Sequence, residues 1–343
     1  SSFTIPDGRV SQNIQENNIV TTNSKRTTSV EQFPGKNTDL VKRLFSRGEA
    51  FDSEGFVTFF TDKPVYQFGN FDVCLDKESI RQSADNFFSQ INAVYHEIKM
   101  MWEIGNVVFV EMDVLYWRKD GSMISLPCCD IFRVEGDKFS ELRIFMDVNP
   151  VFNPSIFVPN SASILTVSQG QTMIPPGTMR RHFAEHPEAQ ERIQQGYVPK
   201  WSISGPRWEI GATGANGNHN SHEQLQAVGE LASAVIAQDW NKVKNYLSDD
   251  ILYKVGSGEP RYGRQEVVNF FQDTFRNIAV FTGHRVRKVW QEPDIITLEM
   301  DAFYEMVGSR KRVTISCCDI YRMRGNKVSE WRVYADMSPW SGS

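Results

Sequence analysis

Cys-Cys-Asp-Ile-Phe-Arg at residues 128–133 and Cys-Cys-Asp-Ile-Tyr-Arg at residues 317–322 are nearly the same stretch, present twice in one chain. The offset between the two stretches is 189 residues. At the same offset, Ser-Glu-Leu-Arg-Ile-Phe-Met-Asp at 140–147 matches Ser-Glu-Trp-Arg-Val-Tyr-Ala-Asp at 329–336. Blocks that recur in the same order and spacing indicate one domain in two copies.

The repeat extends towards the start of each copy. Val-Val-Phe-Val-Glu-Met-Asp at 107–113 matches Ile-Ile-Thr-Leu-Glu-Met-Asp at 295–301, at an offset of 188, so one residue is inserted between the blocks. Order and spacing hold over about 110 residues, which excludes chance as the explanation. Single polar residues farther upstream also match, Tyr66 with Tyr253 and His96 with His284.

Each copy shows a pattern of helices followed by strands. Apolar residues recur at three- and four-residue spacing over 40–51 and 225–237, which predicts an opening helix. A second helix is predicted over 77–91, with Asp76 in its cap region, and over 264–277. Four strands separated by short turns follow in each copy, and such strands pair antiparallel. The predicted fold class is α+β: two tandem, cone-shaped, curved antiparallel sheets, each packed on N-terminal helices as a cystatin-like α+β barrel.

Composition divides the chain into two domains and two connecting parts. The middle segment carries seven prolines and a glycine-rich run at 211–217, with a short helix predicted over 187–195. The glycine run lacks a preceding strand and a Walker lysine, so we interpret it as a connector rather than a phosphate cradle. The predicted parts are an N-terminal arm (1–37), a first domain (38–152), a linker that packs on the domains (153–224) and a second domain (225–343).

Composition also limits the partners. The net charge of −5 and the short basic cluster at 310–312 argue against nucleic acid, and no apolar run approaches the ~18 residues that span a bilayer. The five cysteines, four of them in adjacent pairs, lack the spacing of a disulfide framework or a zinc site. We therefore expect a cytoplasmic protein with reduced thiols and neither metal nor cofactor. Its expected partner is a small hydrophobic molecule, not nucleic acid or a membrane.

Strand periodicity predicts the residues of a pocket in each copy. Side chains alternate between the two faces of a strand, so an inward Asp130 brings Cys128 and Phe132 inward with it. The predicted catalytic residues are Tyr66, His96 and Asp130 in the first copy, and Tyr253, His284 and Asp319 in the second. The predicted substrate-binding residues are Phe68, Met112, Phe132, Met146, Met300, Tyr321 and Trp331.

The two copies resemble the nuclear transport factor 2-like superfamily, which includes ketosteroid isomerase, limonene epoxide hydrolase and the SnoaL-like polyketide cyclases. The resemblance covers residues 38–152 and 225–340. Ala-Phe-Asp-Ser-Glu-Gly-Phe at 50–56 and Ala-Gln-Asp-Trp at 237–240 look like the family's first helix and turn, and Trp-Arg-Val-Tyr-Ala-Asp at 331–336 looks like the last strand of the epoxide hydrolases. The resemblance implies a hydrophobic pocket and a cyclase or isomerase of natural-product biosynthesis.

The resemblance also implies roles for single residues. Ketosteroid isomerases carry an oxyanion-hole aspartate at the position of Asp130 and Asp319, and in an apolar pocket such a carboxyl has a raised pKa and can donate a proton. Other catalytic side chains of the family are replaced in both copies. The position of the isomerase base holds Phe68 and Val255, and its oxyanion tyrosine falls near Arg47 and Ala234. The position of the water-activating aspartate of the epoxide hydrolases holds Ile144 and Val333.

Two classes of function stay open at this point. The first is an isomerase, cyclase or hydratase acting on an apolar, aromatic or polycyclic metabolite, in which aspartate and histidine move protons and tyrosine orients an oxygen. The second is a non-catalytic module that binds a lipophilic ligand or serves in assembly. In that second interpretation the aspartates are structural, the histidines bond to backbone and the tyrosines are wall residues. Trp331 and Tyr334 complete the closing motif, which favours the second copy as the active one.

The outer sheet faces predict how the copies associate. Single-domain relatives dimerise through this face, so the tandem chain is expected to form an internal pseudo-dimer, with a further homodimer as an alternative. Glu111 and Asp113 would lie on a solvated or inter-domain face, since Met112 between them faces inwards. The side chains expected at the covered outer face are Tyr116, Tyr304, Arg143, Arg332, Phe145 and Tyr334.

Overall fold

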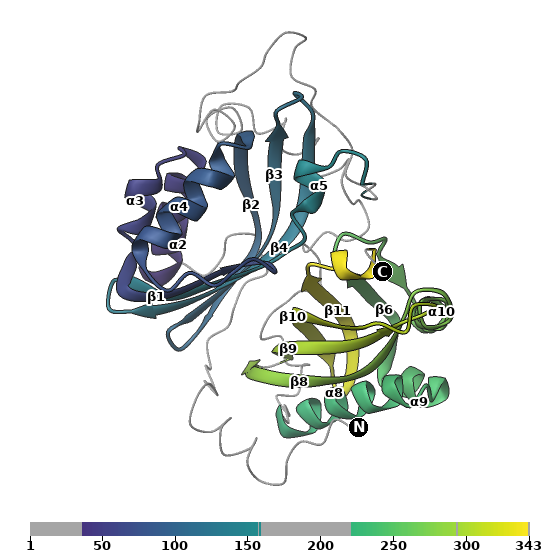
Figure 1. Cartoon of the computed structure of the whole chain (residues 1–343). Helices are drawn as coiled ribbons and strands as arrows, with labels where there is room; N and C mark the ends of the chain where they lie inside the picture. Colours follow the sequence, from purple (N-terminus) through teal and green to yellow (C-terminus); the bar gives the residue numbers. More distant parts are fainter. Residues whose placement is uncertain (1–35, 157, 159–220, 293, 342–343) are drawn as a thin grey trace, which may run out of the picture. The chain divides into compact units, whose positions relative to one another are not determined.

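The computed structural model describes residues 36–156, 158, 221–292 and 294–341, which Figure 1 draws in colour. The chain divides into two compact units, and the described residues of each unit form one domain. The predicted arm up to residue 35, the helix predicted over 187–195 and the glycine run at 211–217 lie outside the described residues. The domain boundaries and the internal pseudo-dimer stay predictions.

The first domain opens with three helices on one face of its sheet (Figure 1). Their bounds are α2 (Lys36–Glu49), α3 (Ser53–Val57) and α4 (Lys77–Phe88). α2 forms because Leu40, Val41, Leu44 and Phe45 make one apolar stripe at helical spacing, and all four side chains are buried. The opening helix predicted over 40–51 is therefore present, although it begins earlier and ends at Glu49.

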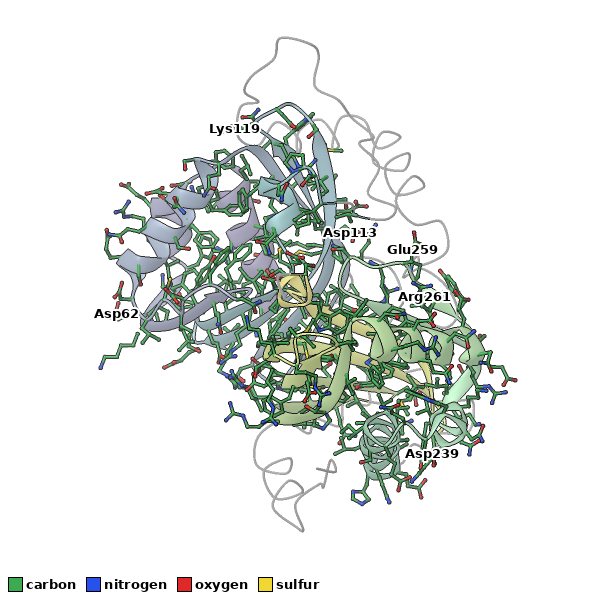
Figure 2. The ribbon with its side chains drawn as sticks, turned by 45° about the vertical axis from the view of Figure 1, so that its right-hand side comes forward. Asp62, Asp113, Lys119, Asp239, Glu259 and Arg261 are labelled. Atoms are coloured by element: carbon green, nitrogen blue, oxygen red, sulfur yellow. The ribbon has the colours of Figure 1, made fainter. Side chains whose placement is uncertain are left out.

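Aspartate caps set where the shorter helices begin. The Asp76 carboxylate accepts a hydrogen bond from the backbone N–H of Ser79 at 2.7 Å, so the cap predicted at Asp76 is confirmed. Asp52 caps α3 in the same way, and in the second domain Asp239 accepts from the N–H of Lys242 at 3.2 Å (Figure 2). α3 and its counterpart in the second domain were not predicted, because each is too short to show a full apolar period.

The sheet of the first domain has the strand order β1-β5-β4-β3-β2. Its strands are β1 (Phe60–Phe68), β2 (Ile91–Ile104), β3 (Val107–Arg118), β4 (Met123–Glu135) and β5 (Lys138–Phe145), and α5 (Asn149–Phe152) follows. The predicted antiparallel pairing is confirmed for β2 to β5. β1 adds a parallel pair with β5, a contact between segments far apart in sequence that no turn could reveal.

The second domain repeats this plan. Its sheet has the order β7-β6-β11-β10-β9-β8, again with one parallel pair, between β6 and β11. The helices are α8 (Ser221–Ile236), α9 (Trp240–Asn245) and α10 (Arg264–Asn277), with a closing 3₁₀ turn η2 (Ser338–Trp340). The strands are β6 (Leu247–Val255), β7 (Arg261–Tyr262), β8 (Ala279–Glu292), β9 (Ile295–Met306), β10 (Arg312–Arg324) and β11 (Lys327–Ala335). The α+β class with two helix-backed sheets is confirmed.

Matched irregularities bend the two sheets in the same places. The register of the first sheet shifts between Ile98 and Met100, and that of the second shifts between Val286 and Lys288, at the repeat offset of 188. A bulge of this kind bends its strand and increases the local twist. The inner face of each sheet thus curves around the helices, and the apolar core of each domain lies between them.

The structure corrects two expectations about the outer face. Tyr116 and Tyr304 were expected there, but both line the inner cavity of their domain. Each stands an even number of residues from Met112 or Met300, and the period of two therefore turns it inwards. Glu111 lies on the opposite face from Met112 as predicted, but it is fully buried, so the solvated alternative was wrong and the inter-domain alternative stays a prediction.

Candidate active site

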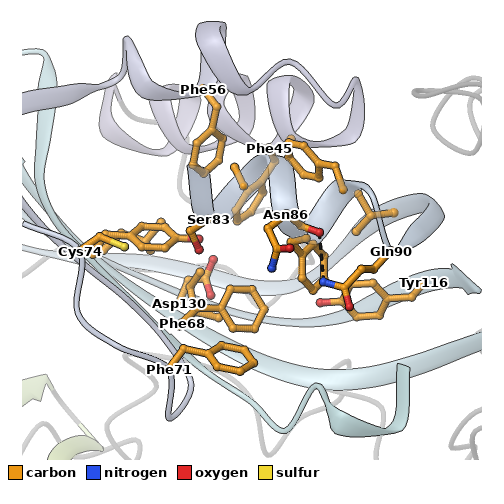
Figure 3. A pocket seen from close by; sticks show the side chains of 18 of the residues that line it. Phe45, Phe56, Phe68, Phe71, Cys74, Ser83, Asn86, Gln90, Tyr116 and Asp130 are labelled. Atoms are coloured by element: carbon orange, nitrogen blue, oxygen red, sulfur yellow. Dashed lines mark hydrogen bonds between the residues drawn. The ribbon is translucent and has the colours of Figure 1, made fainter. Parts of the chain in front are cut away.

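The first domain holds a cavity of about 590 Å³ between its helices and the inner face of its sheet. Phe45 and Phe56 reach into it from the helices, and Phe68 and Asp130 rise towards them from the strands (Figure 3). Its walls are mostly aromatic or aliphatic, with a few polar groups among them. Drug-sized ligands occupy pockets of about 300–1,000 Å³, so this cavity has room for a ring-containing small molecule.

Asp130 is a buried carboxyl in the wall of this cavity. It lies on β4, is 3% exposed, and accepts a hydrogen bond from the Cys128 thiol at 3.3 Å. Burial raises the pKa of Asp130 to about 7, and the thiol offsets only part of this rise. The charged form is disfavoured because the apolar surroundings replace water. A carboxyl with this pKa can both give and take a proton near neutral pH.

Two tyrosines face the same cavity. Burial raises the pKa of Tyr66 and of Tyr116 well above the ordinary phenol value, and the charge of Asp130 contributes to both rises. Both hydroxyls therefore stay protonated and can act as hydrogen-bond donors. The Tyr116 hydroxyl donates to the Met146 sulfur at 3.4 Å, a weak acceptor that a ligand oxygen could replace.

His96 borders the cavity from β2. Its ring stacks on Phe45, with the ring centroids 4.1 Å apart and the planes 5° from parallel. Its Nδ1 atom lies 3.9 Å from a carboxylate oxygen of Glu49, and the other oxygen of Glu49 accepts the backbone N–H of His96 at 3.4 Å. Glu49 is 1% exposed, so a buried acid stands directly behind the imidazole.

The mouth of the cavity is partly apolar and open to solvent. Phe71 and Phe152 line it although they are 53% and 39% exposed. Asn86 and Gln90, at the end of α4 and just after it, add amide groups, and the Gln90 side chain donates to the backbone carbonyl of Asn86 at 3.1 Å (Figure 3). A ligand would therefore enter past aromatic rings with hydrogen-bonding groups beside them.

The equivalent space in the second domain is nearly filled. Its cavity measures about 60 Å³. Trp331 stands where the first domain has Leu142, at the repeat offset of 189. On the second helix, Phe270 replaces Ser83 and Phe271 replaces Ala84, at the offset of 187 set by the helix starts Lys77 and Arg264. The larger rings occupy the volume that the first domain leaves open.

The second aspartate is also held differently. Trp331 Nε1–H donates to Asp319 Oδ2 at 3.0 Å, and the Tyr321 hydroxyl donates to the same oxygen at 3.2 Å. Burial raises the pKa of Asp319 to about 6, less than in the first domain because these donors favour the carboxylate. Burial lowers the pKa of His284 to about 4, so this imidazole is neutral near pH 7.

The structure brings most of the predicted site residues together. Tyr66, Phe68, His96 and Asp130 line one cavity. Met112, Phe132 and Met146 share the predicted face but lie in the core behind that lining. Sequence reasoning missed Tyr116 and Glu49; the period of two could have revealed the first, whereas nothing local marks the second. The predicted residues of the second domain that line its remnant cavity are Tyr253, His284, Asp319, Met300, Tyr321 and Trp331.

Other features bear on which chemistry the chain can use. Among the described residues, no three His, Cys, Asp or Glu side chains gather as a metal site, and no helix is both long and apolar enough to cross a membrane. The five cysteines all lie among the described residues and form no disulfide with one another there; their reduced state stays a prediction. That the chain works without a cofactor stays a prediction.

A family model described as a SnoaL-like domain matches the chain twice, over residues 41–142 and 228–331. These matches cover more than half of the 343 residues. No curated protein matches the chain.

Several solved structures are similar to one domain's length of this chain. An LEH-like epoxide hydrolase of M. tuberculosis is 16% identical, with 35% of this chain and 88% of that chain covered and a TM-score of 0.32. A hypothetical protein with a ketosteroid isomerase-like fold from Catenulispora acidiphila is 18% identical, with coverage of 34% and 88% and a TM-score of 0.31. A cystatin-fold protein from Novosphingobium aromaticivorans is 23% identical, with coverage of 32% and 98% and a TM-score of 0.28.

Proposed function

The chain belongs to the SnoaL-like family, and from this premise we propose that its first domain is a cofactor-free acid–base catalyst acting on an apolar, ring-containing molecule. The observation that carries the proposal is Asp130, an enclosed carboxyl whose pKa of about 7 coincides with an aromatic-walled cavity of about 590 Å³. A carboxyl is poised in this way where it must exchange a proton with a bound ligand near neutral pH.

The proposed mechanism uses three kinds of side chain. Protonated Asp130 gives its proton to a ligand oxygen, and His96 takes a proton from a ligand carbon. Tyr66 and Tyr116 donate hydrogen bonds that orient the oxygen and stabilise charge developing on it. This proton traffic is common to isomerisation, cyclisation and hydration, so the reaction is a cyclase, isomerase or hydratase step, and we place it in natural-product biosynthesis.

A bicyclic ketone, 2-tetralone, tests the proposal without knowledge of the natural substrate. Enolisation exchanges the hydrogens next to its carbonyl with deuterated solvent, and NMR follows the loss of their signals. We expect the full chain to accelerate this exchange. Asp130→Asn should reduce the acceleration by about 10²–10⁴-fold, the usual contribution of a positioned acid or base.

Asp319→Asn is the matched control, since it makes the same change at the same strand position of the filled domain. It should leave the exchange rate unchanged. Equal losses in both variants, or no loss in Asp130→Asn, would overturn the proposal. A chain that binds 2-tetralone but never accelerates exchange would establish the non-catalytic ligand-binding alternative.

The second domain favours the other class of function. Its cavity of about 60 Å³ admits no ring-sized ligand. The Trp331 indole and the Tyr321 hydroxyl already donate their hydrogen bonds to Asp319. We propose that this domain serves a structural or assembly role and keeps the aspartate as a hydrogen-bond acceptor within its core.

A further inference from the structure

Helix α2 presents one face to His96. Phe45, Gly48 and Glu49 stand at positions i, i+3 and i+4, which lie on the same side of a helix. Phe45 stacks on the imidazole, and a Cβ atom placed on Gly48 would come within 4.0 Å of the ring's Cε1. Glu49 completes the contact with its carboxylate. Three residues of one helix thus define the plane, the spacing and one edge of the ring.

The contact with Glu49 distinguishes the two nitrogens of the imidazole. Nδ1 is buried and has no hydrogen-bond partner within the described part of the chain, yet it lies 3.9 Å from Glu49 Oε2. Catalytic hydrogen bonds are often long before a ligand binds and shorten in the complex. The carboxylate is fixed in place, because its other oxygen accepts the N–H of the same residue, His96, at 3.4 Å.

The second domain lacks all three helix residues of this arrangement. At the helix offset of 187, Ala232 replaces Phe45, Val235 replaces Gly48 and Ile236 replaces Glu49. The histidine itself is kept, as His284. Burying an acid to 1% exposure costs free energy of folding, and the second copy shows that the fold does not require this acid. A role in positioning His96 would explain why the first copy has it.

We infer that Glu49 is a positioning residue, which holds the proton of neutral His96 on Nδ1 and so leaves the lone pair of Nε2 to the ligand. The inference rests on the proposed function of the first domain. Carboxylates fix histidine tautomers in this way because an N–H bonded to a carboxylate cannot be the proton-accepting nitrogen. Glu49 then also pairs with the positive charge that His96 gains.

The proton step balances within the cavity. A ligand C–H bond breaks and its proton forms an N–H bond at Nε2 of His96. The electron pair moves to the ligand's carbonyl oxygen, which takes the proton of Asp130 and leaves a carboxylate. Return of the proton from Nε2 to a different carbon completes an isomerisation, and Asp130 recovers its proton from the oxygen.

Nitrogen-15 NMR of the full chain, labelled at histidine, tests the inference without relying on turnover. Couplings from the ring protons show which nitrogen of a neutral imidazole carries the hydrogen, and a His96→Gln variant assigns the signals. We expect His96 in the Nδ1–H form in the unaltered chain. Glu49→Leu, which puts an apolar side chain where the second domain has Ile236, should shift it to the Nε2–H form, and Glu49→Asp should retain part of the Nδ1–H population.

His284 in the same sample is the internal control, and its signals should be the same in all variants. Amide hydrogen exchange of the first domain shows whether that domain remains folded in Glu49→Leu. Exchange of 2-tetralone should fall at least about tenfold in Glu49→Leu, since a general base contributes ~10²–10⁴-fold. A His96 that is Nε2–H in the unaltered chain, or unmoved in Glu49→Leu, would overturn the inference. If the unaltered chain never exchanges 2-tetralone, the proposed function fails while the tautomer still decides the role of Glu49.

Discussion

The two domains place an aspartate at the same strand position, but only the first leaves space above it. Asp130 faces a cavity of about 590 Å³ and accepts from a thiol, whereas Asp319 faces about 60 Å³ and accepts from an indole and a phenol in addition to the Cys317 thiol. The residue is the same and its surroundings differ. The repeated motif thus reflects the shared fold, while cavity volume and hydrogen bonding to the carboxyl decide which copy can react.

The difference arises from few positions. Leu142 against Trp331 changes both features at once, because the indole fills the cavity and its Nε1–H bonds the carboxylate. Ser83 against Phe270 changes the volume and replaces a hydroxyl with an aromatic ring, without adding a donor to the carboxylate. Each of these residues can be exchanged between the copies, so the effects of cavity volume and of hydrogen bonding on the carboxyl can be tested separately.

The largest expected effect is on stability. The pKa of Asp130 is raised from 3.8 in the unfolded chain to about 7, so folding favours its protonated form. Stability from this group is complete below pH 3.8 and is lost as the pH rises to about 7. Asp130→Asn cannot ionise and should therefore stabilise the first domain at pH 8 by up to about 4 kcal/mol, with no gain at pH 3.5.

Hydrogen exchange read by mass spectrometry measures this domain by domain, after correction for the intrinsic exchange rates. Asp319→Asn is the control. Its gain should be smaller, because the pKa of Asp319 reaches only about 6. A gain in stability that is independent of pH, or larger in the second domain, would contradict the assignment of the higher pKa to Asp130.

The next effect is on binding. Leu142→Trp gives the first domain the indole of the second and should fill its cavity. We expect the dissociation constant for 2-naphthol to rise by about 100-fold, about 3 kcal/mol, since the ring loses its enclosed surface. Fluorescence titration measures it. Leu142→Met keeps the volume and should bind as the unaltered chain does; equal weakening in both variants would show that Leu142 acts by something other than volume.

The repeat and the helix-then-strand pattern were sufficient to predict the fold. The blocks 128–133 and 317–322 established the repeat, and the helical stripe from Leu40 to Phe45 has a period of 3.6. The parallel pair of β1 with β5 was not predictable, because it joins segments that no turn connects. Periodicity also placed Asp130 and His96 on inward faces.

The relative openness of the two pockets could not be predicted. The fuller closing motif favoured the second copy, but the same Trp331 that completes the motif fills its cavity. Motif similarity and free volume are different properties, and volume depends on how rings from α10 and β11 meet in space. Glu49 was missed for a related reason, since its partner His96 lies 47 residues away and only the packing of α2 on β2 joins them.

A smaller effect is expected from opening the second cavity. Trp331→Leu copies Leu142 and removes a large buried ring, which should cost about 2 kcal/mol of stability. The vacated space should bind 2-naphthol, and the stoichiometry of binding should rise from one towards two per chain. Isothermal titration calorimetry measures it. A stoichiometry that stays at one would show that the phenylalanines of α10 close the cavity without the indole.

The smallest effect separates hydrogen bonding from volume. Trp331→Phe keeps an aromatic ring beside Asp319 but removes the Nε1–H donor, which now bonds the carboxylate at 3.0 Å. That donor favours the charged form, so its loss should raise the pKa of Asp319 from about 6 towards the 7 of Asp130, a change worth about 1 kcal/mol. Carbon-13 NMR of the carboxyl carbons follows both titrations in one sample. Leu142→Phe is the matched variant of the first domain and should leave Asp130 unchanged, because a leucine donates no hydrogen bond. An unmoved Asp319 titration in Trp331→Phe would mean that the indole does not set the difference between the two carboxyls, which would leave burial and the Tyr321 hydroxyl as its causes.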